Sequence, residues 1–212
     1  MYVPAHFEEK RNEVMHGLIR EQGLGTLVTL SADGLNANHI PFEIDAGEGE
    51  YGILRAHVAR NNPVWRDFSR DVDAMVVFQG AQAYITPSWY ETKKENGKVV
   101  PTYNYMVVHA YGEIKAIEDA AWLRKFVGRL TDRHEAGRAA PWSVDDAPQD
   151  YIEKLLGAIV GIEIPVKRLV GKWKTSQNQP AVNRAGVVAG LREEGGENAI
   201  AMAESVLKAA KS

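Results

Sequence analysis

Alternating apolar and polar residues mark a series of short strands in the first half of the chain. The predicted strands cover residues 26–31, 35–44, 51–58, 73–79 and 82–86. Asp33-Gly34 and the segment 45–50 (DAGEGE) are typical of tight turns between antiparallel strands. Pro41 has no N–H to donate within its predicted strand, so it indicates an edge position or a bulge.

The second half of the chain combines long β-rich runs with amphipathic segments. Strands are predicted within residues 102–117 and at 159–170. Helices are predicted at residues 7–22, 63–69, 118–133 and 149–157, and as two helices after Pro180 that Gly195 and Gly196 separate. The total is about six short strands joined by tight turns, which is typical of a barrel. The expected fold class is therefore mainly β with flanking helices.

Composition narrows the range of functions. The chain has 212 residues, a formal net charge of -3 and no cysteine, which excludes disulfides, thiolate metal sites and iron–sulfur clusters. The six histidines show no metal-ligand spacing, so no metal is expected, and no glycine-rich nucleotide motif follows a strand. The first residues lack an apolar stretch, and residues 155–164 are too short to span a bilayer. We expect a soluble, cytoplasmic protein.

The segment RAHVARNNP (55–63) is a candidate anion site. Arg55 and His57 lie on one face of a strand, and a helix start is expected near Asn61 or Asn62. Backbone N–H groups at a helix start, with Arg60 beside them, favour binding of a phosphate. The alternative is a strand-to-helix junction with an asparagine cap and a solvated arginine.

The segment NANHIPF (36–42) places Asn38 and His39 directly before Ile40 and Pro41. Because proline interrupts the hydrogen-bonded ladder, backbone groups here are available to a ligand. A flat aromatic cofactor needs apolar contact with its faces and amide groups at its polar edge. The alternative is an edge strand protected by proline against aggregation.

Aromatic residues gather in AYITPSWY (83–90) and VPTYNY (100–105), with Trp89, Thr102 and Asn104 among them. Such a cluster can stack on a flat ligand, form a dimer interface or pack in the core. His109, on the following strand, is interpreted as a hydrogen-bonded core histidine rather than a ligand.

The segment GKWKTSQNQP (171–180) follows the last predicted strand and is rich in amide, hydroxyl and ammonium groups. Its candidate residues are Lys172, Ser176, Gln177 and Asn178. They can cover a phosphate or a polar ring edge, and they can equally form a capped loop that leads into the next helix.

The order of these segments resembles the PaiB family, whose members are described as FMN-binding negative transcriptional regulators. The resemblance rests on MYVPAHF, ANHIPF, AHVARNNP, AYITPSWY, VPTYNY with VHAYGEI, GKWKTSQNQP and GVVAGL, and extends from Met1 to about Leu191. It implies a six-stranded antiparallel split β-barrel of Greek-key type. It also implies a homodimer with FMN in a groove between the protomers.

The resemblance also implies a domain organisation and contacts for the flavin. A split-barrel domain over residues 1–178, with inserted helices at 118–157, precedes a helical extension at 179–212 packed on the same domain. The expected phosphate and ribityl contacts are His57, Arg60 and Asn61. The ring-edge contacts are Asn38, His39, Ile40 and Pro41, and the neighbouring wall comprises Trp89, Thr102 and Asn104. The residues that close the site are Lys172, Ser176, Gln177 and Asn178.

Three functions remain open at this point. A transcriptional regulator needs a DNA-binding element, and the C-terminal helix pair is the obvious candidate. Its basic residues are Arg184, Arg192, Lys208 and Lys211, and its acidic residues are Glu193, Glu194, Glu197 and Glu204. Since phosphate contacts dominate DNA affinity, this balance makes direct DNA binding doubtful. The alternatives are an FMN-dependent oxidoreductase resembling flavin reductases and, with less support, a haem-binding or haem-degrading split barrel.

Overall fold

The structure is a computed structural model that describes residues 1–210, so Lys211 lies outside the described residues. The chain forms two compact units. Unit 1 comprises Met1–Met15, Gln79–Val108 and Val170–Ser212, and unit 2 comprises His16–Phe78 and His109–Leu169. The predicted boundary between residues 178 and 179 falls inside unit 1, and the predicted domain division stays a prediction.

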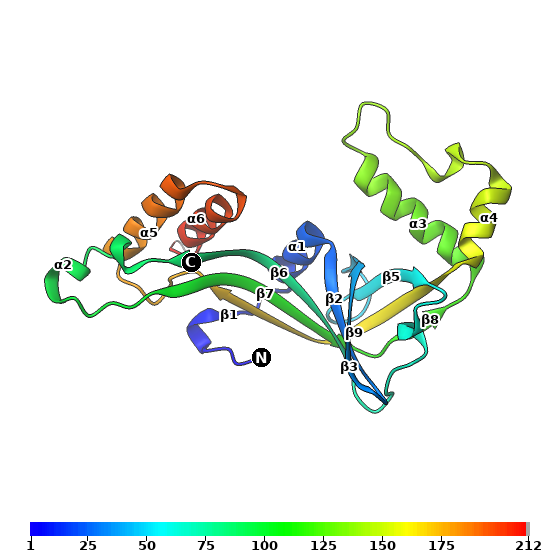
Figure 1. Cartoon of the computed structure of the whole chain (residues 1–212), viewed down its shortest axis with the longest axis horizontal. Helices are drawn as coiled ribbons and strands as arrows, with labels where there is room; N and C mark the ends of the chain where they lie inside the picture. The colour runs from blue at the N-terminus through cyan, green and yellow to red at the C-terminus, as the bar shows by residue number, and fades with distance from the viewer. Residues whose placement is uncertain (211–212) are drawn as a thin grey trace. The chain divides into compact units, whose positions relative to one another are not determined.

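Nine strands are present in the described residues, more than the six expected, and the mainly antiparallel class is confirmed (Figure 1). The strands are β1 (Glu8–Glu9), β2 (Leu24–Ser31), β3 (Gly34–Pro41), β4 (Glu43–Asp45), β5 (Ile53–Ala59), β6 (Ala74–Ile85), β7 (Thr102–Gly112), β8 (Lys115–Ile117) and β9 (Ile159–Lys174). Their order in the sheet is β3-β2-β6-β7-β9-β5-β4, and β1 and β8 each pair with β9.

Six α-helices accompany the strands in the described residues. They are α1 (Asn12–Gln22), α2 (Lys93–Asn96), α3 (Ala120–Glu135), α4 (Gln149–Gly157), α5 (Ala181–Glu194) and α6 (Glu197–Ala209). All four helices that are predicted after residue 117 are confirmed, with ends within a few residues of the prediction. The predicted helix 63–69 is wrong in extent, because only a 3-10 turn at Pro63–Trp65 forms.

The β2–β3 hairpin positions the first candidate segment. Ser31 is paired with Gly34, so the turn is made by Ala32 and Asp33, one residue earlier than predicted. Gly34 has a φ of 111°, which favours glycine. β3 ends the strand order, so the edge position predicted from Pro41 is confirmed.

Two predicted elements differ because of pairing that is distant in sequence. The predicted strand 35–44 divides at Phe42, whose N–H donates to the Gly23 carbonyl at 2.8 Å, and the chain continues as β4 against β5. The first predicted helix begins at Asn12 rather than residue 7. Glu8 and Glu9 are instead extended, because they pair with Lys172 and Gly171 of β9.

Two predicted breaks also differ from the structure. Gly80 does not interrupt its strand, and β6 runs continuously through it. The run 102–117 is divided between β7 and β8, and β8 turns to pair with β9. The loop predicted at 91–98 contains the single turn of α2.

Helices α3 and α4 lie side by side in unit 2 (Figure 1). Asp119 caps α3 by accepting a hydrogen bond from the N–H of Trp122. Leu123 of α3 packs with Ile152 and Leu156 of α4 in a separate apolar cluster. The inserted helices therefore have a small core of their own.

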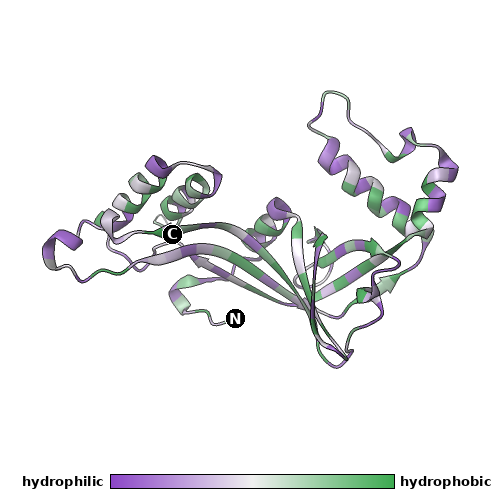
Figure 2. Cartoon of the chain, viewed as in Figure 1, coloured by the Kyte–Doolittle hydropathy of each residue, from purple (hydrophilic) through white to green (hydrophobic). Residues whose placement is uncertain are grey.

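Helices α5 and α6 form the C-terminal part of unit 1. Val187 and Leu191 of α5 pack with Met202 and Val206 of α6, and Ile85 joins the same apolar cluster. Figure 2 shows α6 as mainly hydrophobic, in agreement with this burial. No helix in residues 1–210 is both long enough and apolar enough to cross a membrane.

Glycine in α5 allows Trp89 to approach the helix closely. A Cβ at Gly190 would lie 2.2 Å from the Trp89 ring, and one at Gly186 would lie 2.0 Å from the Trp89 carbonyl oxygen. Such distances are far below van der Waals contact, so α5 and residue 89 can pack only without side chains at these two positions.

We expect Gly190→Ala to lower the free energy of unfolding by about 1–3 kcal/mol, the usual cost of overpacking. Gly128→Ala in α3 is the matched control, because a Cβ there meets nothing within 4 Å. Helix propensity should make that variant about 0.5–1 kcal/mol more stable. Denaturant unfolding measures both changes, and equal stabilisation of the two variants would contradict the close packing of Trp89 on α5.

Candidate functional site

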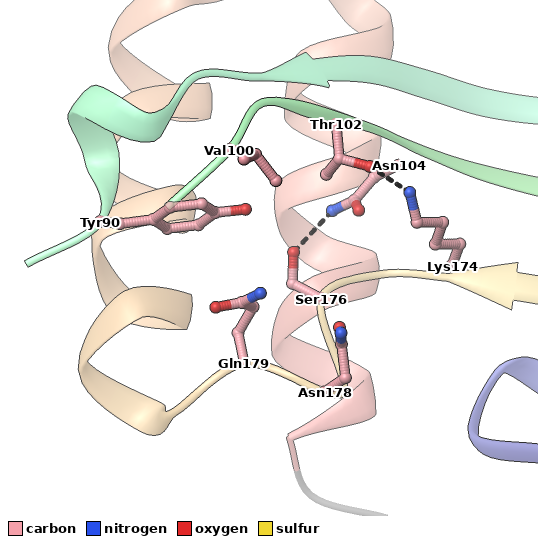
Figure 3. A pocket seen from close by; sticks show the side chains of 8 residues that line it. All are labelled: Tyr90, Val100, Thr102, Asn104, Lys174, Ser176, Asn178 and Gln179. Carbon is pink, nitrogen blue, oxygen red and sulfur yellow. Dashed lines mark hydrogen bonds between the residues drawn. The ribbon is translucent and has the colours of Figure 1, made fainter. Parts of the chain in front are cut away.

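A polar pocket of about 160 Å³ lies in unit 1 (Figure 3). Its lining residues are Tyr90, Val100, Thr102, Asn104, Lys174, Ser176, Asn178 and Gln179. Seven of these eight side chains can donate a hydrogen bond, and none is acidic. Figure 3 shows the polar ends of Tyr90, Ser176 and Gln179 directed toward the same space.

A buried hydrogen bond joins the two chain segments that form the pocket. Asn104 Nδ2 on β7 donates to Ser176 Oγ after β9 at 2.9 Å, and both residues are more than nine-tenths buried. Ser176 has a φ of 63°, which is uncommon for a residue other than glycine. The loop is therefore held in a strained conformation that directs the Ser176 hydroxyl toward Asn104.

Lys174 supplies the cationic group of the pocket. Its ammonium donates to the Thr102 hydroxyl and, at 2.7 Å, to the Tyr103 carbonyl. Burial lowers the pKa of Lys174, and the charge of Lys172 acts in the same direction. Burial also raises the pKa of the Tyr90 phenol, which favours its neutral, donating form.

The structure divides the predicted residues of unit 1 into two groups. Four of the seven line the pocket: Thr102, Asn104, Ser176 and Asn178. The other three have different positions. Trp89 packs on α5, Lys172 donates to the Tyr2 carbonyl at 3.2 Å, and Gln177 bonds the backbone of its own loop at Thr175 and Trp173.

The sequence analysis missed four lining residues, namely Tyr90, Val100, Lys174 and Gln179. The sequence did contain a signal for Lys174, because strand alternation places this residue on the same face as Lys172. The choice between the two lysines depends on Tyr2, whose carbonyl and ring engage Lys172.

In unit 2, the Asn38 region forms a polar strand edge. Asn62 Nδ2 donates to Asn38 Oδ1 at 2.8 Å, and this bond links β3 to the turn after β5. His39 and Pro41 are exposed, whereas the Ile40 side chain is buried in the core. Ile40 can therefore offer a ligand its backbone but not its side chain.

His57 on β5 is half-buried against helix α3. Its ring meets the Phe126 ring edge-on, with 5.8 Å between centroids. The Nδ1 atom is buried and has no partner in the described residues, and burial lowers the pKa of the imidazole. His57 is therefore held neutral at physiological pH.

Arg60 is fully engaged by its own chain. Its guanidinium donates to the Gly157 and Ile159 carbonyls and forms an ion pair with Glu118. The neighbouring turn is capped by Asn62, whose side chain accepts from Val64 N–H at 3.0 Å, while Asn61 is exposed. A phosphate at Arg60 would have to share the guanidinium with these partners.

A second arginine of unit 2 is held differently, and the sequence analysis did not select it. The Arg168 guanidinium carbon lies 3.5 Å from the centroid of the Tyr111 ring. The Tyr111 hydroxyl lies 3.4 Å from His109 Nδ1, and burial lowers the pKa of His109. Arg168 has no acidic partner in the described residues, so its planar N–H edge is available to an anion.

Comparison with known proteins identifies the family of this chain. Residues 1–168 match the family model described as "Putative FMN-binding domain". The chain is 34% identical to the Protease synthase and sporulation protein PAI 2 of Bacillus subtilis, with 96% of this chain and 95% of that protein covered. The chain belongs to the PaiB family of FMN-binding proteins. An uncharacterised protein of Emericella nidulans is 35% identical, with 92% of each chain covered.

Solved structures confirm the fold of this PaiB family member as a flavin-type split barrel. The flavocytochrome Anf3 of Azotobacter vinelandii matches with a TM-score of 0.59 at 11% identity, covering 81% of this chain and 72% of that one. An FAD and haem binding protein of Mycobacterium smegmatis matches with a TM-score of 0.57 at 16% identity, covering 79% and 73%. At these identities the likeness concerns the fold alone.

The family identifies FMN as the cofactor, and the donor groups present are suited to it. FMN carries a phosphate, a ribityl chain and a ring with a polar edge, which require cations, amides and backbone groups. Arg168 and the Asn38–Asn62 pair provide such groups in unit 2. In residues 1–210, no group of three histidine, aspartate or glutamate residues is placed to hold a metal ion.

Two half-buried histidines should make stability depend on pH. Burial lowers the pKa of His57 below its ordinary value of 6.5, so the unfolded chain binds the proton at a higher pH than the folded chain does. The stability from neutral His57 is complete above about pH 6.5 and is lost as the pH falls below it. We expect His57→Gln to lose less stability than the wild type between pH 7 and pH 5.

Thermal unfolding measured across this range checks the assignment. His109→Gln should reduce the pH dependence in the same direction, because burial lowers its pKa too. An unaltered pH profile in both buried-site variants would show that these rings do not contribute.

Proposed function

We propose that this chain is an FMN-binding protein of the PaiB type that works as a cytoplasmic homodimer and holds the flavin chiefly through unit 2. One observation carries the assignment to unit 2. The matched residues 1–168 include all of that unit except Leu169, whereas Val170–Ser212 of unit 1 lies outside the match.

The flavin ring edge is assigned to the exposed edge of β3. Asn38 and His39 offer an amide and an imidazole there, and Pro41 leaves the ladder without a donor. Ile40 contributes its backbone. His57 and the exposed Asn61 are proposed for the ribityl side, in the turn that Asn62 ties to Asn38.

The phosphate is assigned to Arg168. Arg60 is the alternative anchor rather than a second contact, because it bonds Ile159 at the start of β9, and Arg168 lies about 30 Å further along that strand at ~3.3 Å per residue. Tyr111 restrains the Arg168 guanidinium, so little side-chain entropy remains to be lost when an anion binds. Arg60 keeps its ion pair with Glu118 beside any anion that it binds, which lowers its net attraction for a phosphate. When bound, FMN supplies the redox chemistry, and the protein residues bind and orient it.

We expect Arg168→Ala to weaken FMN binding by about 1.5–3 kcal/mol, the scale of a lost hydrogen bond to a charged group. Riboflavin, which lacks the phosphate, should bind the variant and the wild type equally. Quenching of flavin fluorescence on titration measures both affinities. Arg124→Ala, which removes an exposed ion pair with Asp145, is the control and should change neither.

With Arg60 as the anchor in place of Arg168, Arg60→Ala weakens FMN binding instead. In either case this variant should destabilise the protein, because two backbone carbonyls and Glu118 lose their partner. The stability change separates its structural role from its phosphate role. Wild-type FMN affinity in both Arg168→Ala and Arg60→Ala would refute the proposed phosphate anchor.

A regulatory role is proposed to act through a protein partner rather than through DNA contacts of α5 and α6. The described part of these helices carries three basic residues, Arg184, Arg192 and Lys208, against four acidic ones. Arg192 is already paired with Glu204 at 2.8 Å. Without a basic face the helices lack the phosphate contacts that DNA affinity requires.

We therefore expect the FMN-loaded full chain to cause no shift of DNA in a mobility-shift assay at physiological salt. A shift that weakens steeply with added salt would contradict the proposal, because that dependence is typical of phosphate contacts.

The second candidate function is an FMN-dependent oxidoreductase, and the same charge balance favours it because it needs no DNA element. It predicts that NADH or NADPH bleaches the visible absorption of the bound flavin and that air restores it. A flavin that stays oxidised with both donors would leave the regulatory role as the proposed function.

A further inference from the structure

The pocket of unit 1 has properties that a flavin site does not need. Its volume of about 160 Å³ is below the range of about 300–1,000 Å³ typical of cofactor-sized sites. Val100 is the one aliphatic residue among the eight that line it, so the pocket lacks an apolar wall for an isoalloxazine ring. Lys174, Ser176, Asn178 and Gln179 lie beyond the residues matched by the FMN-binding family model.

The pocket is nevertheless built for a ligand of a definite charge. Its donors are one ammonium, two aliphatic hydroxyls, one phenol and three amides, and its lining contains no carboxylate. Asn104, Ser176 and Tyr90 are each more than nine-tenths buried, so these donors are fixed before any ligand arrives. Fixed donors reduce the ordering cost of binding.

The cation of the pocket lacks an acidic partner in the described residues. Lys174 donates to a hydroxyl and a carbonyl, both neutral groups, and lies near the second cation Lys172. Burial is unfavourable for an ammonium and lowers the pKa of Lys174, although Tyr105 nearby acts in the opposite direction. An anion in the pocket would supply the missing charge and accept hydrogen bonds from the amides.

We propose that this pocket binds a compact oxyanion group, a phosphate or a carboxylate, as a ligand separate from FMN. Lys174 provides the charge, and Asn104, Ser176 and Gln179 provide directed hydrogen bonds. The strained backbone at Ser176 keeps its hydroxyl at the pocket, and Gln177 braces the loop through Thr175 and Trp173.

The test uses the FMN-loaded full chain, with inorganic phosphate and acetate as separate probes in calorimetric titrations. We expect at least one probe to bind, and the stronger of the two identifies the ligand class. Lys174→Met should weaken that binding by about ten- to a hundredfold, the scale of a lost charged hydrogen bond. Lys93→Met, at an exposed position of α2, is the matched control and should bind as the wild type does.

A second variant distinguishes loss of anion binding from loss of the fold. Asn104→Asp keeps the side-chain shape, can accept a hydrogen bond from Ser176 and places a negative charge beside Lys174. The Lys174 ammonium offsets part of the cost of burying this carboxylate, thermal unfolding checks that the variant is folded, and the folded variant should exclude both probes. Neither variant should change FMN affinity, measured by fluorescence quenching.

Three outcomes would overturn the proposal. The first is that neither probe binds the wild type at millimolar concentration. The second is that Lys174→Met and Asn104→Asp bind the probes as the wild type does. The third is that both variants lose FMN affinity, which would assign the pocket to the flavin itself and overturn the proposed placement of the flavin in unit 2, while FMN binding as such would stand.

Discussion

Backbone pairing along β9 is the constraint on which most of the other elements depend. This strand has 16 residues, and it pairs with β5 and β8 in unit 2 and with β1 in unit 1. Two glycines adapt it to its neighbours. A Cβ at Gly161 would lie 2.3 Å from the Trp122 ring, and one at Gly171 would lie 2.7 Å from the Met15 sulfur. Helices α3 and α1 can therefore pack directly on the strand, which fixes where β9 ends and where the pocket loop begins.

The pairing of β9 also determines where the pocket loop that contains Ser176 begins. A non-glycine residue in the left-handed region costs free energy, so Ser176 keeps its conformation only because its surroundings determine it. The Asn104 side chain donates a hydrogen bond to the Ser176 hydroxyl, and the Gln177 side chain donates one to the Trp173 carbonyl. A loop with this much internal bonding resists rearrangement, and its polar groups stay directed toward one space even though each could be solvated separately.

The local sequence pattern predicted which helices and strands form better than it predicted their first and last residues, and the reason is physical. Helices α3 and α4 have clear apolar spacing, α3 is also capped by Asp119, and both form as predicted. Residues 8–9 carry no signal of their own for a strand, because their partners lie more than 160 positions away. The same applies to the candidate site: polarity identified Asn104 and Ser176, whereas only tertiary packing distinguishes Tyr90 in the pocket from Trp89 against α5.

The proposed placement of the flavin and a small anion in different units has a thermodynamic consequence. Strands β6, β7 and β9 each have residues in both units, so a shift along any of them changes the geometry of both sets of donors. Any effect of the anion on FMN affinity must then be matched by an equal effect of FMN on anion affinity, since coupling between sites is reciprocal. Such a coupling would let the anion tune flavin binding in either proposed function, and its size is the ratio of the FMN affinities with and without the anion.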